Sequence, residues 1–327
     1  MASMEHIAVI GEAVADAFLP GGEAGGGDGL RLAVRAGGGP ANTAVALARL
    51  GTPARFLGRL SDGPFGRLLR HHLVSSGVDV SGCVDAPENA TLAVTAIDAA
   101  GQAGYDFYAG GTADWQWTRA ELAARRPDAA ACVHTGSLAL VLPPGGPLIE
   151  DLLTEVRDST TISIDPNVRP GMVPAADYRA RLGRWTRLAD VVRLSEEDLA
   201  HLAPGKRAET VCDAWHRDGV RLVVVTRGQA GVTASLDGRR VSVDAPPVEV
   251  VDTVGAGDAF MAGLLHAFRH GGFLGGRLEA LTEADLERAL GFATGVAAET
   301  CRVPGADPPW AERLDPAVRA LSMPGRA

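Results

Sequence analysis

The chain has 327 residues, of which 46% are hydrophobic, and it carries a formal net charge of -9 at pH 7 with a pI of about 5.4. This length can bury a large core as one α/β unit with an appendage or as two modest domains, and we take one catalytic unit, 1–327, as the simpler organisation. Because the basic residues are dispersed rather than gathered into a stripe, an extended polyanion such as nucleic acid is excluded as a partner.

No stretch approaches the roughly 18 apolar residues that a membrane span needs, and the first six residues do not begin a signal segment. The four cysteines are far apart and show no paired spacing for zinc or redox chemistry, so we expect reduced thiols. We therefore expect a cytoplasmic protein without a membrane partner.

Short apolar runs alternate with helical patterns along most of the chain, which predicts an α/β fold with a mostly parallel sheet covered on both faces. The predicted strands are Ile7–Ile10, Ala131–His134, Ile162–Ile164, Val191–Leu194 and Leu222–Val225, and Val250-Val251 is a further β-type run. Ligands collect where such strands end, so the loops after Ile164, Leu194, Val225 and Val251 should converge on a site.

Two regions break this alternation and predict hairpins. One joins Ala13–Phe18 to Leu30–Ala36 through the glycine-rich Gly21–Gly29, and the other joins Ala90–Ile97 to Tyr105–Tyr108. The glycine-rich connection is too long for a dinucleotide loop and no helix follows it. The residues after Ile10 also lack the G-x-G-x-x-G that a dinucleotide-dependent oxidoreductase would need, so that class is disfavoured.

A glycine run, Gly37-Gly38-Gly39, precedes Pro40 and a helical segment that Gly51 terminates. Glycines here permit close approach of the backbone to a ligand, and Asn42 offers a donor and an acceptor to hydroxyl groups. An ordinary junction between a loop and a helix accounts for the same pattern.

The stretch from Asp252 to Asp258 reads D-T-V-G-A-G-D and enters a helical segment, predicted as 259–270. Glycine turns and first-turn N–H groups make an anion pocket. If Asp258 faces that pocket, it can accept the proton of a hydroxyl that attacks a phosphoryl group. The alternative is that Asp258 only complements the helix dipole, and the local residues leave both open.

With these two motifs in this order, the chain resembles the ribokinase-like, pfkB-type carbohydrate kinases. Further similarity lies at 165–170, 194–199 and 225–231, so the resemblance covers nearly the whole chain. It implies a three-layer ribokinase-like fold, with helices on both faces of the sheet and a small β lid from about 12–37 and 90–112. The lid often also serves for dimer contacts in this family, so the resemblance implies a homodimer through the lid.

The resemblance also implies the site residues. For the sugar they are Asp16, Gly38, Gly39, Asn42, Asn167 and Arg169, with Phe107 or Tyr108 covering the ring unless these aromatics only pack the lid. Asp258 would be the catalytic base, assisted by N–H groups of Gly255, Ala256 and Gly257. Thr226 and Gly228 would lie beside the ATP phosphates and ribose, and Ala293 and Val296 beside adenine, although helix packing explains the last two almost as well.

Each of the two candidate metal sites also has a structural interpretation. Glu197 and Asp198 lie in a Ser195-x-x-Asp198 pattern where the family usually has N-x-x-E for the magnesium region, and this pattern is also a helix capping box. Asp252 resembles a monovalent-cation ligand of some members, binding K⁺, or else it braces its loop.

The implied activity is transfer of the ATP γ-phosphoryl group to a sugar hydroxyl with Mg²⁺, and the motifs look most similar to the fructokinase branch. A P-loop mechanism is excluded, because the only lysine, Lys206, lies in no P-loop motif. Alternatives are ribokinase, nucleoside kinase and 2-keto-3-deoxygluconate kinase, although the last often has an arginine where Ala109 follows Tyr108. A catalytically silent sugar-binding relative also stays open.

Overall fold

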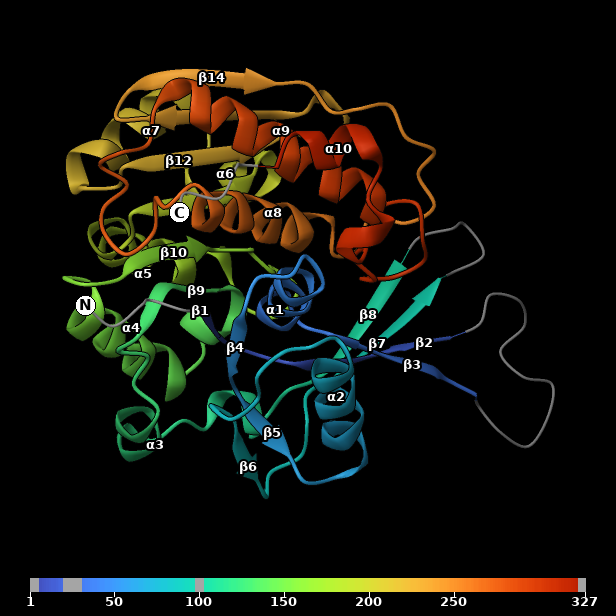
Figure 1. Ribbon diagram of the computed structural model, residues 1–327. Coiled ribbons are helices and arrows are strands. Elements are labelled where there is room, and N and C mark those ends of the chain that lie inside the picture. The colour runs from blue at the N-terminus through green and yellow to red at the C-terminus, as the bar shows by residue number, and fades with distance from the viewer. Residues whose placement is uncertain (1–5, 20–30, 98–102, 323–327) are drawn as a thin grey trace.

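A central eight-stranded sheet organises the chain in the computed structural model, which describes residues 6–19, 31–97 and 103–322 (Figure 1). Its strand order is β14-β13-β12-β11-β10-β9-β1-β4, and all neighbours from β12 to β4 are parallel, whereas β13 and β14 extend the sheet antiparallel. The strands are β1 (His6–Ile10), β4 (Ala54–Leu57), β9 (Ala130–Gly136), β10 (Thr161–Asp165), β11 (Val191–Ser195), β12 (Leu222–Thr226), β13 (Val232–Leu236) and β14 (Arg239–Val243).

Alternate residues of strands β1 and β12 enter two different hydrophobic cores. In β1, Ile7 and Val9 join one core, and Ala8 and Ile10 join the other. The first core is closed by α1 (Gly39–Arg49), α8 (Ala256–His270) and α9 (Glu283–Thr300). The second is closed by α4 (Gly145–Val156), α5 (Ala175–Leu188), α6 (Glu196–Leu202) and α7 (Ala208–Asp218). The predicted three-layer arrangement is thus confirmed, and burial on both faces explains why a run such as 222–225 is apolar at every position.

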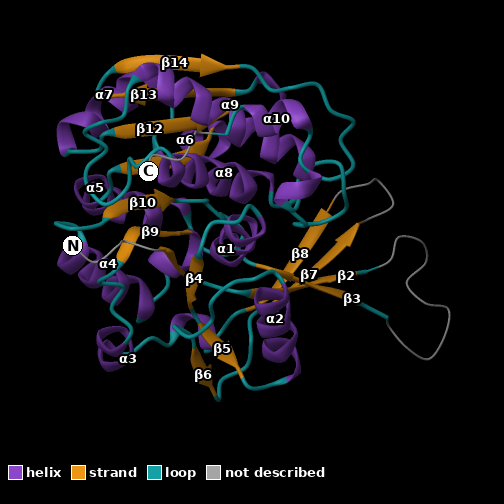
Figure 2. Cartoon of the chain, viewed as in Figure 1, coloured by secondary structure: helices purple, strands orange, loops and turns teal. Residues whose placement is uncertain are grey.

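The lid is a separate four-stranded sheet that projects from the end of the layered body (Figure 2). It has the order β3-β2-β7-β8 and consists of β2 (Val14–Phe18), β3 (Ala33–Gly37), β7 (Leu92–Ile97) and β8 (Ala103–Tyr108). Both predicted hairpins are confirmed, and parallel pairing of β2 with β7 joins them into one sheet. The connections expected at 21–29 and 100–102 lie outside the described residues.

Smaller elements complete the chain. Helix α2 (Pro64–Ser75) contacts lid strands β2 and β3, α3 (Arg119–Ala124) lies against α4, and α10 (Pro316–Ala320) packs on α9. Strands β5 (Arg59–Ser61) and β6 (Val84–Ala86) pair in parallel. Among the residues described, no helix is both long and apolar enough to cross a membrane.

Two boundaries differ from those predicted. Val250 and Val251 form no strand and are 42% and 58% exposed, because Pro246 and Pro247 just before them cannot donate to a ladder and the Val251 N–H bonds instead to the Cys301 carbonyl. Helix α8 begins at Ala256 rather than 259. The earlier start places Asp258 in the first turn of the helix.

Candidate active site

The start of α8 forms a cradle of backbone N–H groups. Gly255 is its N-cap with φ 76°, and a Cβ built there would lie 2.6 Å from the Cβ of Ala306, so both conformation and space require glycine. First-turn N–H groups have no acceptor within the helix, although that of Ala256 donates to the Thr253 carbonyl at 3.2 Å. The partial positive charge of the helix end adds to their attraction for an anion.

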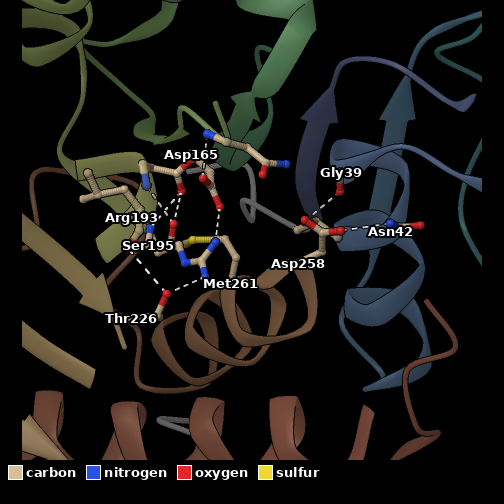
Figure 3. Close-up of polar contacts among 12 residues, drawn as sticks. Gly39, Asn42, Asp165, Arg193, Ser195, Thr226, Asp258 and Met261 are labelled. Atoms are coloured by element: carbon tan, nitrogen blue, oxygen red, sulfur yellow. Dashed lines mark hydrogen bonds and ion pairs between the residues drawn. The ribbon is translucent and has the colours of Figure 1, made fainter. Parts of the chain in front are cut away.

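The carboxylate of Asp258 turns away from its own helix and toward α1 (Figure 3). Its Oδ2 accepts a hydrogen bond from Asn42 Nδ2 at 2.9 Å. Its Oδ1 lies 3.3 Å from the position that a Cβ on Gly39 would occupy, and Asn167 Nδ2 lies 2.8 Å from the same position. The absent side chain of Gly39 therefore leaves room between a carboxylate and an amide.

A small cavity joins these residues. It is lined by Gly39, Pro40, Thr43, His134, Gly136, Ser137, Asp165, Asn167 and Asp258. The predicted base thus shares a cavity with the N-terminal glycine motif, and the geometry goes beyond dipole compensation, the alternative that the local residues left open.

Burial raises the pKa of Asp258 from 3.8 to about 6. The hydrogen bond from Asn42 and the charges of Arg169 and Arg193 lower the pKa, whereas the charge of Asp165 raises it. A carboxylate with this pKa is ionised at neutral pH and still binds a proton more readily than an ordinary aspartate.

The N-terminal glycines fit closely against the strands of the lid. Gly38 has φ 98°, and a Cβ there would lie 2.7 Å from the Glu12 carbonyl oxygen. Asn42 follows in the first turn of α1 and is 8% exposed.

Asp16 is an acidic residue on lid strand β2. Its Oδ2 lies 1.9 Å from where a Cβ of Gly37 would be, so the carboxylate occupies the space of the side chain that Gly37 lacks. Burial raises the pKa of Asp16 to about 6, and the charge of Arg169 lowers it. Gly37 thus fixes where the Asp16 carboxylate can lie, and its place in the glycine run is the signal in the sequence for this role.

Strand register separates the two lid aromatics. Asp16 pairs with Ala93, and Ala93 pairs with Phe107, so Asp16 and Phe107 point to the same face of the lid. Tyr108 pairs with Leu92 and points to the opposite face, where it is 61% exposed. Adjacent residues of a strand cannot be assigned to faces without the register, so the sequence leaves Phe107 and Tyr108 as alternatives, and a sugar contact of Tyr108 stays a prediction.

The loop after β10 carries Asn167 and Arg169. Asn167 adopts φ 41°, and its N–H donates to Asp165 Oδ1 at 3.1 Å. The Arg169 side chain is exposed, and its charge lowers the pKa of both Asp16 and Asp258. Arg169 therefore acts electrostatically on both carboxylates.

A buried ion pair lies beneath the cradle and was not predicted. Arg193 on β11 is 7% exposed, and its guanidinium donates to Asp165 Oδ2 at 2.8 Å and to Thr226 Oγ1 at 2.7 Å. A Cβ on Gly257 would lie 2.7 Å from Arg193 Nη1, so the first turn of α8 rests directly on this cation. A charged residue inside the apolar run 191–194 was the signal that could have revealed it.

Asp198 is held by its own helix end. Its Oδ2 accepts from the N–H and the hydroxyl of Ser195, and its Oδ1 accepts from the Val168 N–H at 2.7 Å. The capping box predicted as an alternative is present, while Glu197 is exposed.

The remaining predicted ATP residues separate into two groups. Thr226 lies at the end of β12 beside Arg193, and Gly228 is exposed in the next turn with φ 54°. Ala293 and Val296 are fully buried between α9 and α8, where they face Gly263. Helix packing accounts for these two, and a contact with adenine stays a prediction.

Asp252 binds backbone groups with both oxygens. Oδ1 accepts from the Val254 N–H at 3.0 Å and Oδ2 from the Gly305 N–H at 2.7 Å. These bonds brace the loop that leads into the cradle. Among the described residues no group of three or more His, Cys, Asp or Glu side chains is suited to hold a metal.

Comparison with known proteins identifies the family. Residues 4–313 match the pfkB family carbohydrate kinases. The fructokinase of Rhizobium leguminosarum bv. trifolii is 38% identical over 72% of this chain and 72% of its own length. The fructokinase of Klebsiella pneumoniae is also 38% identical, over 79% of this chain and 82% of its own length.

Solved structures agree with the sequence relatives. The fructokinase of Xylella fastidiosa with bound ATP superposes with a TM-score of 0.85 at 27% identity, covering 97% of this chain and 98% of that one. The fructokinase of Vibrio cholerae O395 with fructose, ADP and calcium ion has a TM-score of 0.78 at 27% identity, with 98% and 99% covered. The protein is thus a phosphotransferase with a hydroxyl acceptor, and it belongs to the pfkB family of carbohydrate kinases.

Proposed function

We propose that the protein is a fructokinase, which transfers the γ-phosphoryl group of ATP to a hydroxyl of fructose. The observation that carries this proposal is the placement of Asp258 Oδ1 beside Gly39 and Asn167, at the start of a helix that can receive phosphate. The names of the relatives support fructose as the acceptor.

In the proposed reaction, the sugar hydroxyl gives its proton to Asp258 while its oxygen forms a bond to the γ-phosphorus and the bond to ADP breaks. Asn42 fixes Oδ2, so that Oδ1 meets the hydroxyl. N–H groups of Gly255, Ala256 and Gly257 hold the phosphoryl oxygens, and Arg193 beneath them adds positive charge. No covalent enzyme intermediate is required.

The lid and the glycine motif would bind the sugar. Asp16 can accept hydrogen bonds from two neighbouring hydroxyls, and Phe107 on the same face can cover the apolar side of the ring. Backbone groups of Gly38 and Gly39 and the side chains of Asn42, Asn167 and Arg169 complete this subsite.

We further propose that ATP enters with Mg²⁺, which supplies positive charge to the phosphate oxygens. Thr226, Gly228, Ala293 and Val296 remain the proposed ATP residues, and Glu197 and Asp198 the magnesium region. For Asp252 a role in binding K⁺ competes with the bracing described above. We also propose that the protein acts in the reducing cytoplasm, where its four cysteines would stay free thiols.

A homodimer through the lid is proposed from the exposed apolar side chains there. Tyr108 is 61% exposed on the face opposite Asp16, and Leu32 is 38% exposed next to β3. Sedimentation velocity of the wild type and Tyr108→Asp tests it. A dimer that dissociates in the variant supports the lid interface, and an unchanged sedimentation coefficient refutes it.

The activity is tested by ADP release from ATP and Mg²⁺ with fructose, ribose, 2-keto-3-deoxygluconate or adenosine as the acceptor. We expect kcat/KM for fructose to exceed the others at least tenfold, and Asp258→Asn to abolish the signal. Preference for another acceptor would refute the fructokinase proposal but keep the kinase. ADP release with none of them would favour the silent sugar-binding relative.

A further inference from the structure

Arg35 connects the lid to a part of the chain that is far away in sequence. It lies on β3 directly opposite Asp16 on β2, so the two side chains leave the same face of the lid. Its Nη1 donates to the Pro304 carbonyl at 2.8 Å, across 269 positions of sequence. The guanidinium carbon also lies 6.0 Å from the ring centroid of Phe18, which limits the directions it can take.

The segment that receives Arg35 also touches the phosphate cradle. Gly305 donates its N–H to Asp252 Oδ2, and the N–H groups of Val251 and Asp252 donate to the Cys301 carbonyl at 2.8 and 3.2 Å. Ala306 packs directly against Gly255, the N-cap of α8. Residues 301–306 thus form a strap with the lid on one side and the residues that precede Asp258 on the other.

Gly305 marks the closest point between the strap and the lid. It has φ 78°, and a Cβ there would lie 2.7 Å from Arg35 Nη1. The left-handed conformation of Gly305 disfavours any residue with a side chain, and the guanidinium lies against the strap backbone itself. A shift of β3 would move the Arg35 guanidinium relative to the Pro304 carbonyl that accepts from it.

We infer that Arg35 is a positioning residue that couples occupation of the sugar subsite to the geometry of the phosphate cradle. This inference rests on the proposed function, because it takes Asp16 as a sugar ligand. Sugar on Asp16 restrains β2, its partner β3 carries Arg35, and Arg35 holds the strap against Gly255. A kinase coupled in this way presents its cradle fully formed only when an acceptor is present, which disfavours transfer to water.

The contact itself is tested without any ligand. Hydrogen exchange is compared between the wild type, Arg35→Ala, Arg35→Lys and the control Arg31→Ala, which removes an exposed arginine just before the same strand. We expect Arg35→Ala to speed exchange in both 33–37 and 301–306, Arg35→Lys to do so less, and Arg31→Ala to leave 301–306 unchanged. Unchanged exchange at 301–306 in Arg35→Ala overturns the proposal even if the enzyme is a fructokinase.

The coupling is tested by calorimetry with a non-hydrolysable ATP analogue and Mg²⁺, in the presence and absence of fructose. Coupled sites change each other's affinity by the same factor, commonly about 5-fold or more. In the wild type and in Arg31→Ala we expect fructose to change the Kd of the ATP analogue by about 5-fold or more. In Arg35→Ala we expect this ratio to approach 1, while the Kd of each ligand measured alone changes less than about 2-fold. A side chain with a merely structural role would weaken single-ligand binding instead.

Kinetics gives the third readout. We expect Arg35→Ala to lower kcat about tenfold and to raise ADP release without sugar relative to turnover with sugar, while Arg35→Lys recovers part of both. Weaker fructose binding with unchanged coupling would make Arg35 a direct sugar contact and overturn the inference. A wild type that binds no fructose refutes the proposed function instead, and the exchange experiment still decides whether the strap exists.

Discussion

Asp258 and Asp198 occupy the same position in two helices and behave in opposite ways. Each is the third residue after the N-cap, in α8 and α6 respectively, and each helix begins at the end of the sheet where the site lies. Asp198 returns to its own N-cap, Ser195, and also accepts from the backbone of Val168. Asp258 instead reaches another helix and accepts from Asn42.

The N-cap residue decides between these two outcomes. Ser195 offers a hydroxyl and an N–H that satisfy the carboxylate locally, which stabilises the helix end. Gly255 has no side chain, and its left-handed conformation keeps the turn open. An acidic residue in a first helical turn therefore becomes available for chemistry when its own helix gives it nothing to bind.

Replacing the base should have the largest effect. We expect Asp258→Asn to lower kcat by about 10²- to 10⁴-fold, because the amide cannot take the proton of the hydroxyl. The Kd of an ATP analogue, measured by calorimetry, should stay within about 3-fold. An Asn variant with more than a tenth of wild-type turnover would remove Asp258 from the role of base.

Closing the gap beside Asp258 should have the next largest effect. In Gly39→Ala the new methyl would lie 2.8 Å from Asn167 Nδ2 and 3.3 Å from Asp258 Oδ1, so we expect kcat/KM for sugar to fall about 10- to 100-fold. Gly183→Ala, in α5 with no atom within 3.4 Å of its Cβ, is the matched control and should retain full activity. Equal activity of both variants would show that this gap is not where the sugar binds.

Acid should act on activity and on stability in opposite directions. Because the pKa of Asp258 is about 6, kcat/KM should fall about tenfold per pH unit below pH 6. A folded-state pKa raised above the ordinary 3.8 means that the folded protein binds more protons between pH 3.8 and 6, so this group's contribution to the free energy of unfolding increases as pH falls through that window.

The comparison of wild type with Asp258→Asn isolates that contribution. We expect the variant to be more stable at pH 7 by about 1–3 kcal/mol, with the difference vanishing near pH 4, as measured by urea unfolding at each pH. A difference that is constant between pH 4 and 7 would show that the carboxylate titrates elsewhere.

The smallest effect on turnover should come from Asp198. Asp198→Ala removes the half of the capping box in which the carboxylate accepts from Ser195, and it leaves the buried Val168 N–H without its acceptor. We therefore expect a loss of about 1–3 kcal/mol in the free energy of unfolding and a change in kcat below tenfold. Calorimetric melting and the ADP assay measure the two quantities. A loss of turnover as large as that of Asp258→Asn at an unchanged Tm would instead assign Asp198 to magnesium.

The parallel sheet, its two helix layers and the paired lid strands were predictable because their signals are local. A strand buried on both faces must be apolar throughout, as in 222–225, and a helix between Pro40 and Gly51 has its start and stop in the sequence. The glycine motif and the D-T-V-G-A-G-D motif are likewise continuous in the sequence, so both sides of the candidate site could be predicted from the chain.

What escaped prediction depends on register and on contacts between strands. Phe107 and Tyr108 differ only in the face they occupy, which the pairing with β7 decides. Arg193 donates hydrogen bonds to Asp165 and Thr226, which lie on the two strands beside β11. These partners could not be predicted because local sequence patterns do not determine the order of strands in the sheet. Val250-Val251 has the apolar pattern of a strand, but Pro246 and Pro247 before it interrupt the ladder of hydrogen bonds that a strand needs.

The missing side chain of Gly37 links the position of Asp16 to the pairing of the lid strands. The Asp16 carboxylate lies in the place of that side chain when β2 and β3 are paired in the observed register, and a slip of two residues in one direction would set Arg35 there instead. If Asp16 holds the sugar as proposed, a molecule with that slip would bind nucleotide but no acceptor. The number of sugar-binding sites per molecule would then report the fraction of molecules whose hairpin has assembled in register.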